Sequence, residues 1–502
     1  MTGFALDLST SGGMTAALAP ELILSAWAML LTLYAGFRHR GAGDQRVAGW
    51  IALAGLVSTL VVVLVMWWGD VRSQGMPFMV ALDGFRWGSA TVFLLGGILT
   101  VVLSLSYVDR ERLWAPEYYV LLLLATVGMM FMGGGLDLIV IFLGLELMSV
   151  AVYVLAGINR RSVFAAEAAL KYFLLGAFAS GFLLYGIALI YGATGATNLT
   201  LINYQVRSLG LGSNVLVLVG TGMLLIGFGF KAAAVPFHMW TPDVYDGAPT
   251  PITAFMAAAV KAAGFAGLVR VLLVALGDVS PSWQGVVWWL SALTMIVGNL
   301  VALSQRHLKR MLAYSSIAHA GYLLAAVTSG TPLGAGAFLF YALTYTLMTI
   351  GAFAVVAAAG RDGERDVLIE DLSGLGRRRP WLAVAIAVFM LSLLGFPGTA
   401  GFMGKWLILQ SVLQAGQPRL AVVLVLASVV SAGYYLPVVM VMFMKAPLAE
   451  GATVQFPVSR GTRIVVATTA IALILFGVWP NEALDIARRG GEDFRSTPTA
   501  QP

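Results

Sequence analysis

Fourteen long apolar runs dominate this sequence and restrict the folds open to it. Each is close to the roughly 20 residues that a helix needs to cross about 30 Å of hydrocarbon. Hydrophobic residues make up 59% of the chain and charged residues 11%, whereas soluble proteins carry about 25% charged residues. We therefore predict an all-α polytopic membrane protein with about 14 transmembrane helices. The predicted spans cover residues 15–37, 48–69, 89–107, 118–133, 137–158, 164–192, 215–239, 250–276, 284–304, 310–329, 334–359, 380–413, 419–443 and 461–480.

The layout of these spans indicates an internal repeat. Spans four to eight and spans nine to thirteen form two units of five helices and nearly equal length. Because five is odd, the second unit must cross the membrane in the opposite sense to the first, as in inverted transporter repeats. We expect four parts: an N-terminal three-helix segment, the first five-helix repeat, the second, inverted repeat, and a C-terminal helix with a polar tail. Their expected bounds are 1–117, 118–277, 278–443 and 444–502.

A proline lies inside the fourth predicted helix of each repeat. Pro236 follows a Gly-Phe-Gly sequence, and Pro397 lies within Gly395-Phe396-Pro397-Gly398. Proline and glycine free backbone carbonyls at membrane depth, so a matched pair of broken helices is the best sequence pointer to a transport site. The alternative is two unrelated kinks, since proline is frequent in transmembrane helices.

Loop charges predict the orientation of the chain. An even number of spans places both termini on one side, and most loop lysines and arginines lie on the opposite side. By the positive-inside rule, the termini are periplasmic if the protein lies in the inner membrane of a bacterial cell. The same loop bias accounts for the net charge of +6 without nucleic acid. The first run begins late and lacks a basic flank, which favours a retained span over a signal peptide, and the leader before it has no assigned role.

Lysine is concentrated inside the predicted spans. Four of the six lysines fall there but only one arginine does, namely Lys171, Lys231, Lys261, Lys405 and Arg270. A charge at the bilayer centre costs about 3 kcal/mol or more. Arginine stays protonated in any surroundings, whereas a desolvated lysine can release its proton. The pattern therefore favours proton exchange over fixed counter-charges. We expect Arg270, close to Asp278, to extend outward to the interface.

Two carboxylates complete the set of candidates. Glu146 lies in the middle of a span, where a nearby lysine would hold it ionised in a switchable pair. The alternative is a static ion pair between two helices. Glu167 and Lys171 are four residues apart on one helical face, which is as typical of a local pair near the interface as of a functional one.

The remaining lysines and two histidines lie near the expected helix breaks or at mid-depth. Lys231 precedes Pro236, Lys405 follows Pro397, and Lys261 lies near the middle of its span. His319, inside the tenth span, is a candidate proton relay, while His238 is better explained by a structural role.

Several cofactor classes are excluded. There are no cysteines, so the chain forms no disulfide, holds no cysteine-ligated iron–sulfur cluster and carries no c-type haem. No dinucleotide-binding glycine motif occurs. Gly404-Lys405 lacks the rest of a phosphate loop. Tyrosine and tryptophan are scattered, which indicates interfacial anchors and packing.

Four segments of the sequence resemble a known family: Lys231 to Pro251, Phe255 to Lys261, Arg310 to Tyr322, and Gly395 to Lys405. They resemble the subunit N (organellar subunit 2) branch of the antiporter-like membrane subunits of NADH:quinone oxidoreductase, respiratory complex I. The related Mrp-type antiporters usually have Leu-Pro-Asp-Ala-His where this chain has Thr241-Pro-Asp-Val-Tyr245. The resemblance covers roughly residues 118–443.

The resemblance implies a proton-translocating subunit with no redox centre of its own, a translocase component of an enzyme. It implies that Glu146 modulates Lys231, that Lys261 is a central relay, that Lys405 serves the second half-channel, and that Lys171 takes part. NADH, FMN, iron–sulfur clusters and quinone would be bound by partner subunits. The expected partners are a neighbouring antiporter-like subunit, small membrane subunits and lipids. The alternatives are an Mrp-type Na⁺/H⁺ antiporter subunit and a scaffold that moves no proton.

Overall fold

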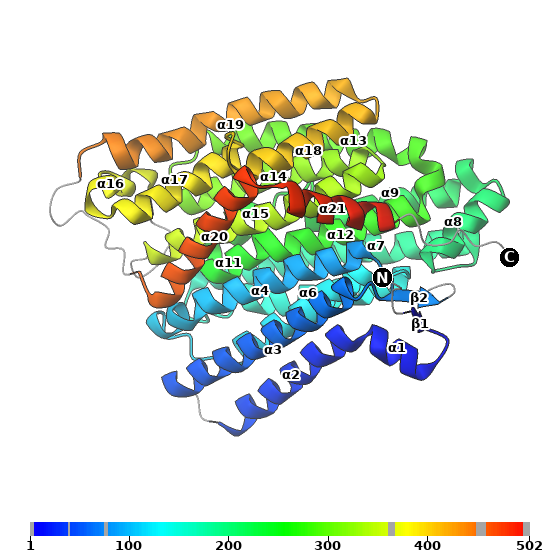
Figure 1. Ribbon diagram of the computed structural model, residues 1–502, viewed down its shortest axis with the longest axis horizontal. Helices are drawn as coiled ribbons and strands as arrows, with labels where there is room; N and C mark the ends of the chain where they lie inside the picture. The colour runs from blue at the N-terminus through cyan, green and yellow to red at the C-terminus, as the bar shows by residue number, and fades with distance from the viewer. Residues whose placement is uncertain (1–4, 39–40, 75–78, 360–366, 448–457, 495–502) are drawn as a thin grey trace.

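The computed structural model describes residues 5–38, 41–74, 79–359, 367–447 and 458–494. Its long helices run side by side in one bundle, with α19 (Pro418–Met444) along one edge and α2 (Ala19–Phe37) with α3 (Ala42–Trp68) along the opposite edge (Figure 1). The short helix α21 (Asn481–Asp493) lies across the front of the bundle in this view.

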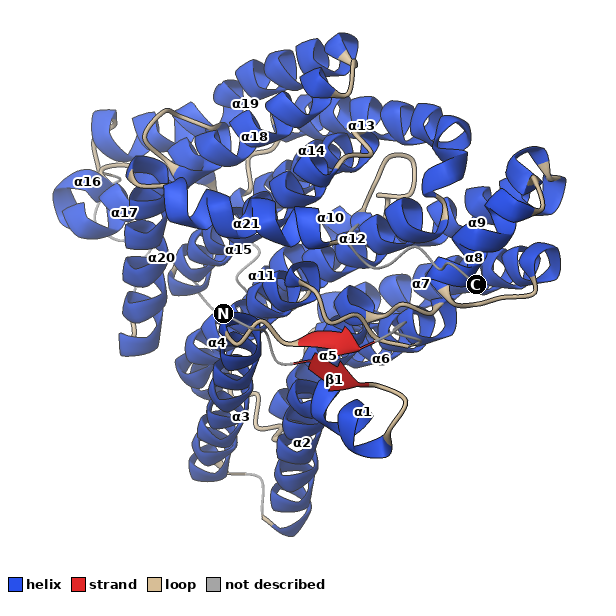
Figure 2. Cartoon of the chain, turned by 45° about the vertical axis from the view of Figure 1, so that its right-hand side comes forward, coloured by secondary structure: helices blue, strands red, loops and turns tan. Residues whose placement is uncertain are grey.

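The N-terminal segment folds as three long helices with a small cap. Besides α2 and α3 it contains β1 (Ala5–Asp7), α1 (Ser11–Ala17), β2 (Arg72–Gln74) and α4 (Gly84–Arg110). The leader that had no assigned role forms β1, which pairs in parallel with β2 next to α1 (Figure 2). Apart from this two-stranded sheet, the regular elements among the described residues are helical.

The first predicted repeat contains a run of helices broken near its end. Its elements are α5 (Glu117–Gly134), α6 (Leu138–Ala156), α7 (Val163–Thr194), α8 (Leu199–Ser208), the 3-10 turn η1 (Leu211–Ser213), α9 (Val215–Ala232), α10 (Thr241–Gly247), α11 (Thr250–Phe255), the π-helical η2 (Met256–Val260), α12 (Lys261–Arg270) and the π-helical η3 (Val271–Ala275). The last four form one continuous span, which contains two π-helical stretches that the sequence did not reveal.

The second predicted repeat follows the same order of long helices. Its elements, after the 3-10 turn η4 (Gly277–Val279), are α13 (Ser280–Ala302), α14 (Leu308–Thr328), α15 (Pro332–Ala358), η6 (Ile369–Leu372), α16 (Leu375–Arg378), α17 (Pro380–Leu394), α18 (Ala400–Gln414) and α19. The chain then continues through α20 (Arg460–Val478) and α21. The polar stretch expected at 360–379 is described only from residue 367, and the tail only to residue 494.

The polytopic all-α fold is confirmed. Among the described residues, 13 helices are long and apolar enough to cross a membrane, and α17 is a shorter apolar helix. Together α17 and α18 occupy the predicted span 380–413. The predicted span 215–239 is too long, because α9 ends at Ala232.

Both critical prolines lie between helices instead of inside them. Pro236 is in the linker from α9 to α10, and Pro397 is in the linker from α17 to α18. Each preceding helix ends in a left-handed residue, Ala233 with φ 58° and Gly395 with φ 87°. A left-handed residue turns the chain out of the helix and leaves its last carbonyls open to other donors. The two breaks therefore share a geometry although their sequences differ.

Arg270 points inward, so the expected outward orientation is wrong. Its side chain is fully buried and its guanidinium binds both carboxylate oxygens of Asp83, at 2.6 and 2.9 Å, and the Gly133 carbonyl at 3.0 Å. The cause is tertiary: Asp83 precedes α4 and meets the end of α12 inside the protein. Arg270 of α12 therefore joins the start of α4 to the end of α5.

A second buried arginine was assigned to a loop by the span prediction. Arg86 lies in the first turn of α4, which begins earlier than the predicted 89, and its guanidinium binds Glu21 of α2 at 2.8 Å. Arg86 also donates to the carbonyls of Ala17 and Ala81, both at 2.9 Å. It therefore joins α2 to α4.

The polar tail is helical up to Asp493 and packs back onto the bundle. Gly490 lies against Gly84 of α4, and Gly491 against Gly336 of α15; an added Cβ at Gly491 would come within 2.5 Å of the Gly336 nitrogen. Such a close approach is possible only without a side chain. Helix α21 thereby clamps α4 to α15.

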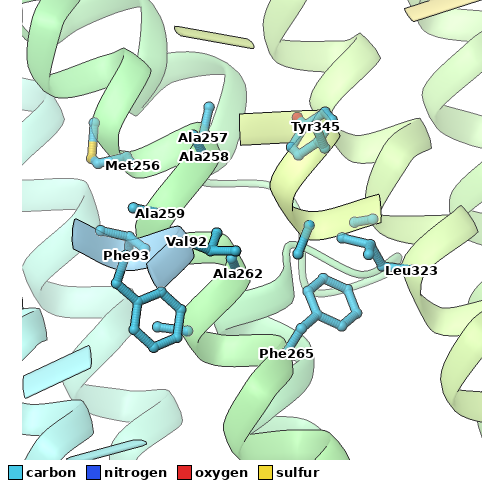
Figure 3. Packing of buried hydrophobic residues seen from close by; sticks show 14 of the residues in the cluster. Val92, Phe93, Met256, Ala257, Ala258, Ala259, Ala262, Phe265, Leu323 and Tyr345 are labelled. Atoms are coloured by element: carbon cyan, nitrogen blue, oxygen red, sulfur yellow. The ribbon is translucent and has the colours of Figure 1, made fainter. Parts of the chain in front are cut away.

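The centre of the bundle is built from small residues around the π-helical stretch η2. Met256, Ala257 and Ala258 lie there, and Ala259 faces Val92 and Phe93 of α4 (Figure 3). A Cβ at Gly96 of α4 would lie 2.7 Å from the Cβ of Ala259. This close contact positions Lys261, the residue that follows η2, in the interior.

Candidate functional site

Lys231 lies in the last turn of α9, in an aromatic cage. Its side chain is 4% exposed, and its ammonium donates to the Tyr153 hydroxyl at 3.0 Å. The ammonium also lies 4.8 Å from the ring centre of Tyr153, 5.2 Å from that of Tyr172 and 5.6 Å from that of Phe230. Aromatic faces stabilise a cation in place of water. Among the described residues, the cage therefore gives the amine one hydrogen-bond acceptor and no carboxylate partner.

Glu146 does not form the expected pair with Lys231. It lies on α6, is half-buried, and accepts a hydrogen bond from the Ser180 hydroxyl of α7. The Lys231 ammonium instead contacts Tyr153, which lies about two turns further along α6. Ser180 is one turn from Gly176, which lies against the Tyr153 hydroxyl. Glu146 and Lys231 thus each bind a different hydroxyl group, of Ser180 and of Tyr153.

Gly176 on α7 leaves room for the Tyr153 hydroxyl. A Cβ at this position would lie 1.9 Å from that oxygen. We expect Gly176→Ala to push Tyr153 away from Lys231 and to lower the free energy of unfolding by about 1–3 kcal/mol. The matched control is Gly181→Ala on the same helix, where no atom lies within 4 Å. Thermal unfolding of both variants measures the difference, and equal midpoints would contradict this packing.

Lys261 is held by a residue of α14, in the second predicted repeat. Its side chain is 1% exposed, and its ammonium donates to the carbonyl of Ser316 at 2.7 Å and to the hydroxyl of the same residue. Ser316 lies on α14, whereas Lys261 begins α12. A buried lysine with two oxygen acceptors is well anchored and has no carboxylate within ion-pair distance among the described residues.

His319 lies one turn beyond Ser316 on α14. It is 1% exposed, and both ring nitrogens bind tyrosine hydroxyls, Nδ1 at 2.7 Å from Tyr341 and Nε2 at 3.1 Å from Tyr435. Its ring stacks on Tyr345 with centres 4.9 Å apart. An imidazole bonded at both nitrogens can accept a proton on one side and release one on the other.

Lys405 follows the second helix break. Its ammonium donates at 2.9 Å to the Leu394 carbonyl, the last of α17, and lies 4.5 Å from the ring centre of Tyr322. The C-terminal end of a helix carries partial negative charge, which favours a cation there. At the other helix break, after α9, the indole of Trp240 donates to the Phe230 carbonyl at 3.1 Å.

Helix α14 connects these groups. Ser316, His319 and Tyr322 are spaced three residues apart, so they lie on one helical face. Ser316 binds Lys261 and Tyr322 lies against Lys405. The interpretation of the tyrosines as scattered interfacial anchors is therefore wrong for this group. The missed signal was the i, i+3 spacing on α14 and the Tyr341–Tyr345 pair on α15.

Lys171 belongs to a surface cluster and not to the buried set. Its side chain is 40% exposed, and its ammonium lies 2.7 Å from both Glu167 and Asp243. The carboxylate of Asp243 also forms an ion pair with the guanidinium of Arg310 on α14, at 3.3 Å. The predicted Glu167–Lys171 pair is confirmed, but Lys171 is not one of the buried lysines. Lys309, which the span prediction assigned to a loop, is buried instead: it is 2% exposed and donates to the Ala248 carbonyl at 2.7 Å.

Asp243 of α10 joins α7 to α14 and should respond to acid. Partial burial alone would raise its pKa, but the hydrogen bond and charge of Lys171, with Arg310, lower the pKa below its ordinary value. Ionised Asp243 thus stabilises the fold above the ordinary carboxyl pKa, near 4, and this stability is lost as the pH falls through the lowered value. We expect Asp243→Asn to lower the thermal midpoint at pH 7 and to lose this effect progressively below about pH 4. A difference independent of pH would contradict the pairing.

His238 lies in the α9–α10 linker and is half-buried. Its Nδ1 atom is buried without a hydrogen-bond partner among the described residues. It contacts neither Lys231 nor Lys261 through a hydrogen bond. Nothing in the described chain gathers three or more metal-binding side chains at one place.

Comparisons with known proteins agree with the resemblance seen in the sequence. Residues 135–431 match the family described as "NADH:quinone oxidoreductase/Mrp antiporter, TM". An NADH-quinone oxidoreductase subunit N of Gemmatimonas aurantiaca is 48% identical over 99% of this chain and 96% of its own length.

Two solved structures have the same fold. A chain of respiratory complex I from Thermus thermophilus with bound aureothin is 38% identical, with a TM-score of 0.80, and the match covers 93% of this chain and 99% of that one. A chain of the Mrp complex from Dietzia sp. DQ12-45-1b is 23% identical, with a TM-score of 0.83 and coverage of 96% and 98%. The second likeness shows the fold alone.

Proposed function

Because this chain belongs to the NADH-quinone oxidoreductase subunit N family, we propose that it carries protons across the membrane while electron transfer proceeds in other subunits. The observation that supports this proposal most directly is the series of buried amines in Lys231, Lys261 and Lys405. Each is 6% exposed or less and hydrogen-bonds to a neutral oxygen. A lysine held this way can exchange a proton without breaking an ion pair.

The proposed route follows the contacts in order. A proton on Lys231 passes along the interior to Lys261, then by Ser316 and His319 to the Tyr322 side of Lys405. Gly264 supports the first step, because a Cβ there would lie 3.2 Å from the Cβ of Lys231, so α12 runs directly beside that lysine. Hydroxyl groups and interior water can relay protons between fixed amines over such a path.

Glu146 is proposed to modulate Lys231 from outside the cage. In the arrangement described here, Ser180 binds the carboxylate and Tyr153 binds the ammonium. If Glu146 turned toward the ammonium, the negative charge would favour the protonated lysine, and its return would favour proton release. The two side chains therefore form a switch with two states, one in which they pair and one in which each binds a different hydroxyl group. We assign Lys171 a secondary role, at the surface cluster with Asp243, and His238 a structural one.

We further propose the setting of the chain. The parts 1–117, 118–277, 278–443 and 444–502 act as an N-terminal segment, two inverted half-channels and a C-terminal clamp. Other membrane subunits, including an antiporter-like and smaller ones, would adjoin it in the inner membrane of a bacterial cell, with both termini in the periplasm. NADH, FMN, iron–sulfur clusters and quinone would be bound by those partners.

The alternative of an Mrp-type Na⁺/H⁺ antiporter subunit has weaker support, since the Mrp likeness is limited to fold. A transport assay on sealed vesicles separates the two. We expect NADH-driven proton uptake that is independent of Na⁺. We also expect the chain to co-purify with NADH-oxidising subunits. Na⁺-dependent proton exchange by vesicles without NADH would support the antiporter instead.

A further inference from the structure

A deep groove opens between the N-terminal segment and the C-terminal helices, away from the buried lysines. Its volume is about 920 Å³, and its walls are α3, α4, α15, α20 and α21. Along α4 the lining runs from Gly84 to Leu99, a rise of roughly 22 Å at 1.5 Å per residue. One leaflet of a bilayer with a hydrocarbon core of about 30 Å is about 15 Å thick, so the groove is long enough for an acyl chain.

The composition of the groove changes along its length. Away from α21 and β2 the lining is largely apolar and includes Leu95, Ile98 and Leu99 of α4, Leu347 of α15 and Ala472 of α20. The mouth, next to α21 and β2, is charged. Trp67, Trp68 and Trp87 also line the groove, and tryptophan is enriched where hydrocarbon meets the headgroups. This gradient from apolar to charged matches an amphipathic lipid standing along the membrane normal.

Charges at the mouth carry both signs and include an unpaired arginine. Arg72 is bound by Asp70 at 2.8 Å and by Asp493 at 3.1 Å. Arg489 is exposed and has no ion pair or hydrogen bond among the described residues, although Glu482 and Glu492 share the rim with it. Acidic groups thus outnumber arginines at this end, which disfavours a lipid with net negative charge.

We propose that this groove binds one zwitterionic aminophospholipid of the phosphatidylethanolamine class. One of its two acyl chains lies between α4 and α20, its phosphate binds Arg489, and its amine lies near Glu482 and Glu492. The phosphate offers Arg489 the charge-assisted hydrogen bonds that it lacks among the described residues. The acyl chain fills a space between α3, α4, α15 and α20 that side chains leave open.

Photolabelling in native membranes tests this site. Vesicles that contain the full-length chain are illuminated with a phosphatidylethanolamine carrying a diazirine on its acyl chain, and the labelled peptides are identified by mass spectrometry. We expect labels on α4 and α20. Ala472→Trp fills the groove and should lower labelling about tenfold, while Ala467→Trp, at an exposed position of α20 outside the groove, should leave it unchanged.

A charge variant tests the headgroup without disturbing the packing. Arg489→Gln should also lower labelling about tenfold, through loss of the phosphate contact. Arg488→Gln is the matched control, because this neighbour is exposed and does not line the groove. The proposal is overturned if Ala472→Trp labels like the wild type, if a phosphatidylglycerol probe labels as strongly, or if Arg488→Gln and Arg489→Gln behave alike. None of these results depends on proton transport.

Discussion

Replacing Lys231 by methionine is expected to stop proton transfer through this chain while leaving its fold intact. Methionine has a similar volume, and exchanging a buried charge for an apolar group is often neutral or stabilising. The ammonium that Tyr153 accepts from would be gone. Because a positioned proton-transfer group contributes about 100-fold or more to its step, the proton-to-electron ratio of the assembled complex should fall.

Two further variants separate proton exchange from simple charge. Lys231→Arg keeps the positive charge but stays protonated, so it should fail as Lys231→Met does. Lys445→Met removes an exposed lysine that lies 3.8 Å from Glu370 and should change nothing. The ratio is measured in sealed vesicles with a pH-sensitive dye and NADH. An unchanged proton-to-electron ratio in the assembled Lys231→Met complex would support the scaffold alternative. An unchanged ratio in the Lys231→Arg complex would show that a fixed positive charge is enough for proton transfer.

Removal of Arg270 should have the largest effect on stability. Its loss leaves the Asp83 carboxylate, 4% exposed, without its principal partner. Breaking one side of a buried ion pair costs about 3–5 kcal/mol. Arg270→Met should therefore lower the amount of folded chain and its thermal midpoint, measured after mild detergent extraction. Arg310→Met, which removes a third-exposed arginine of the surface cluster, is the control with a small expected effect.

A double variant and a pH series test the cause. Asp83→Leu combined with Arg270→Met removes both charges and should recover much of the loss, because no unpaired ion remains.

Burial alone would raise the pKa of Asp83, but the Arg270 guanidinium lowers it below the ordinary value. The pair therefore stabilises the fold above the ordinary carboxyl pKa, and that stability is lost as the pH falls through the lowered pKa. If Arg270→Met alone unfolds no earlier than the wild type, the pair has no such role.

Much of the candidate site could be predicted because few charged side chains are tolerated inside membrane-spanning runs. Lys231, Lys261 and Lys405 are identifiable by their position in long apolar runs, and the structure buries all three. The helix breaks were also visible in Pro236 and Pro397, although these residues proved to lie between helices. Both inferences rely on local sequence, which is enough when each span must satisfy its own backbone in hydrocarbon.

The partners of those residues could not be predicted. Ser316, which binds Lys261, and Tyr322, which lies against Lys405, both come from α14, far from either lysine in the sequence. Tyr153 reaches Lys231 from α6 across a gap that Gly176 leaves open. Such contacts depend on which helices become neighbours, and a single sequence does not contain that information in its spacing.

Hydropathy by itself determined that this chain is a helical bundle of about 14 spans with lysines inside its apolar runs, because the cost of polar groups in hydrocarbon acts on each helix separately. Only the tertiary structure decided which charges are hidden. Arg270, eight residues from Asp278 in the chain, turned inward to Asp83, whereas Lys171, near the start of a predicted span, remained 40% exposed beside Asp243. The reason is that a charge is buried or exposed according to the partner that packing brings to it, and these partners come from distant parts of the chain.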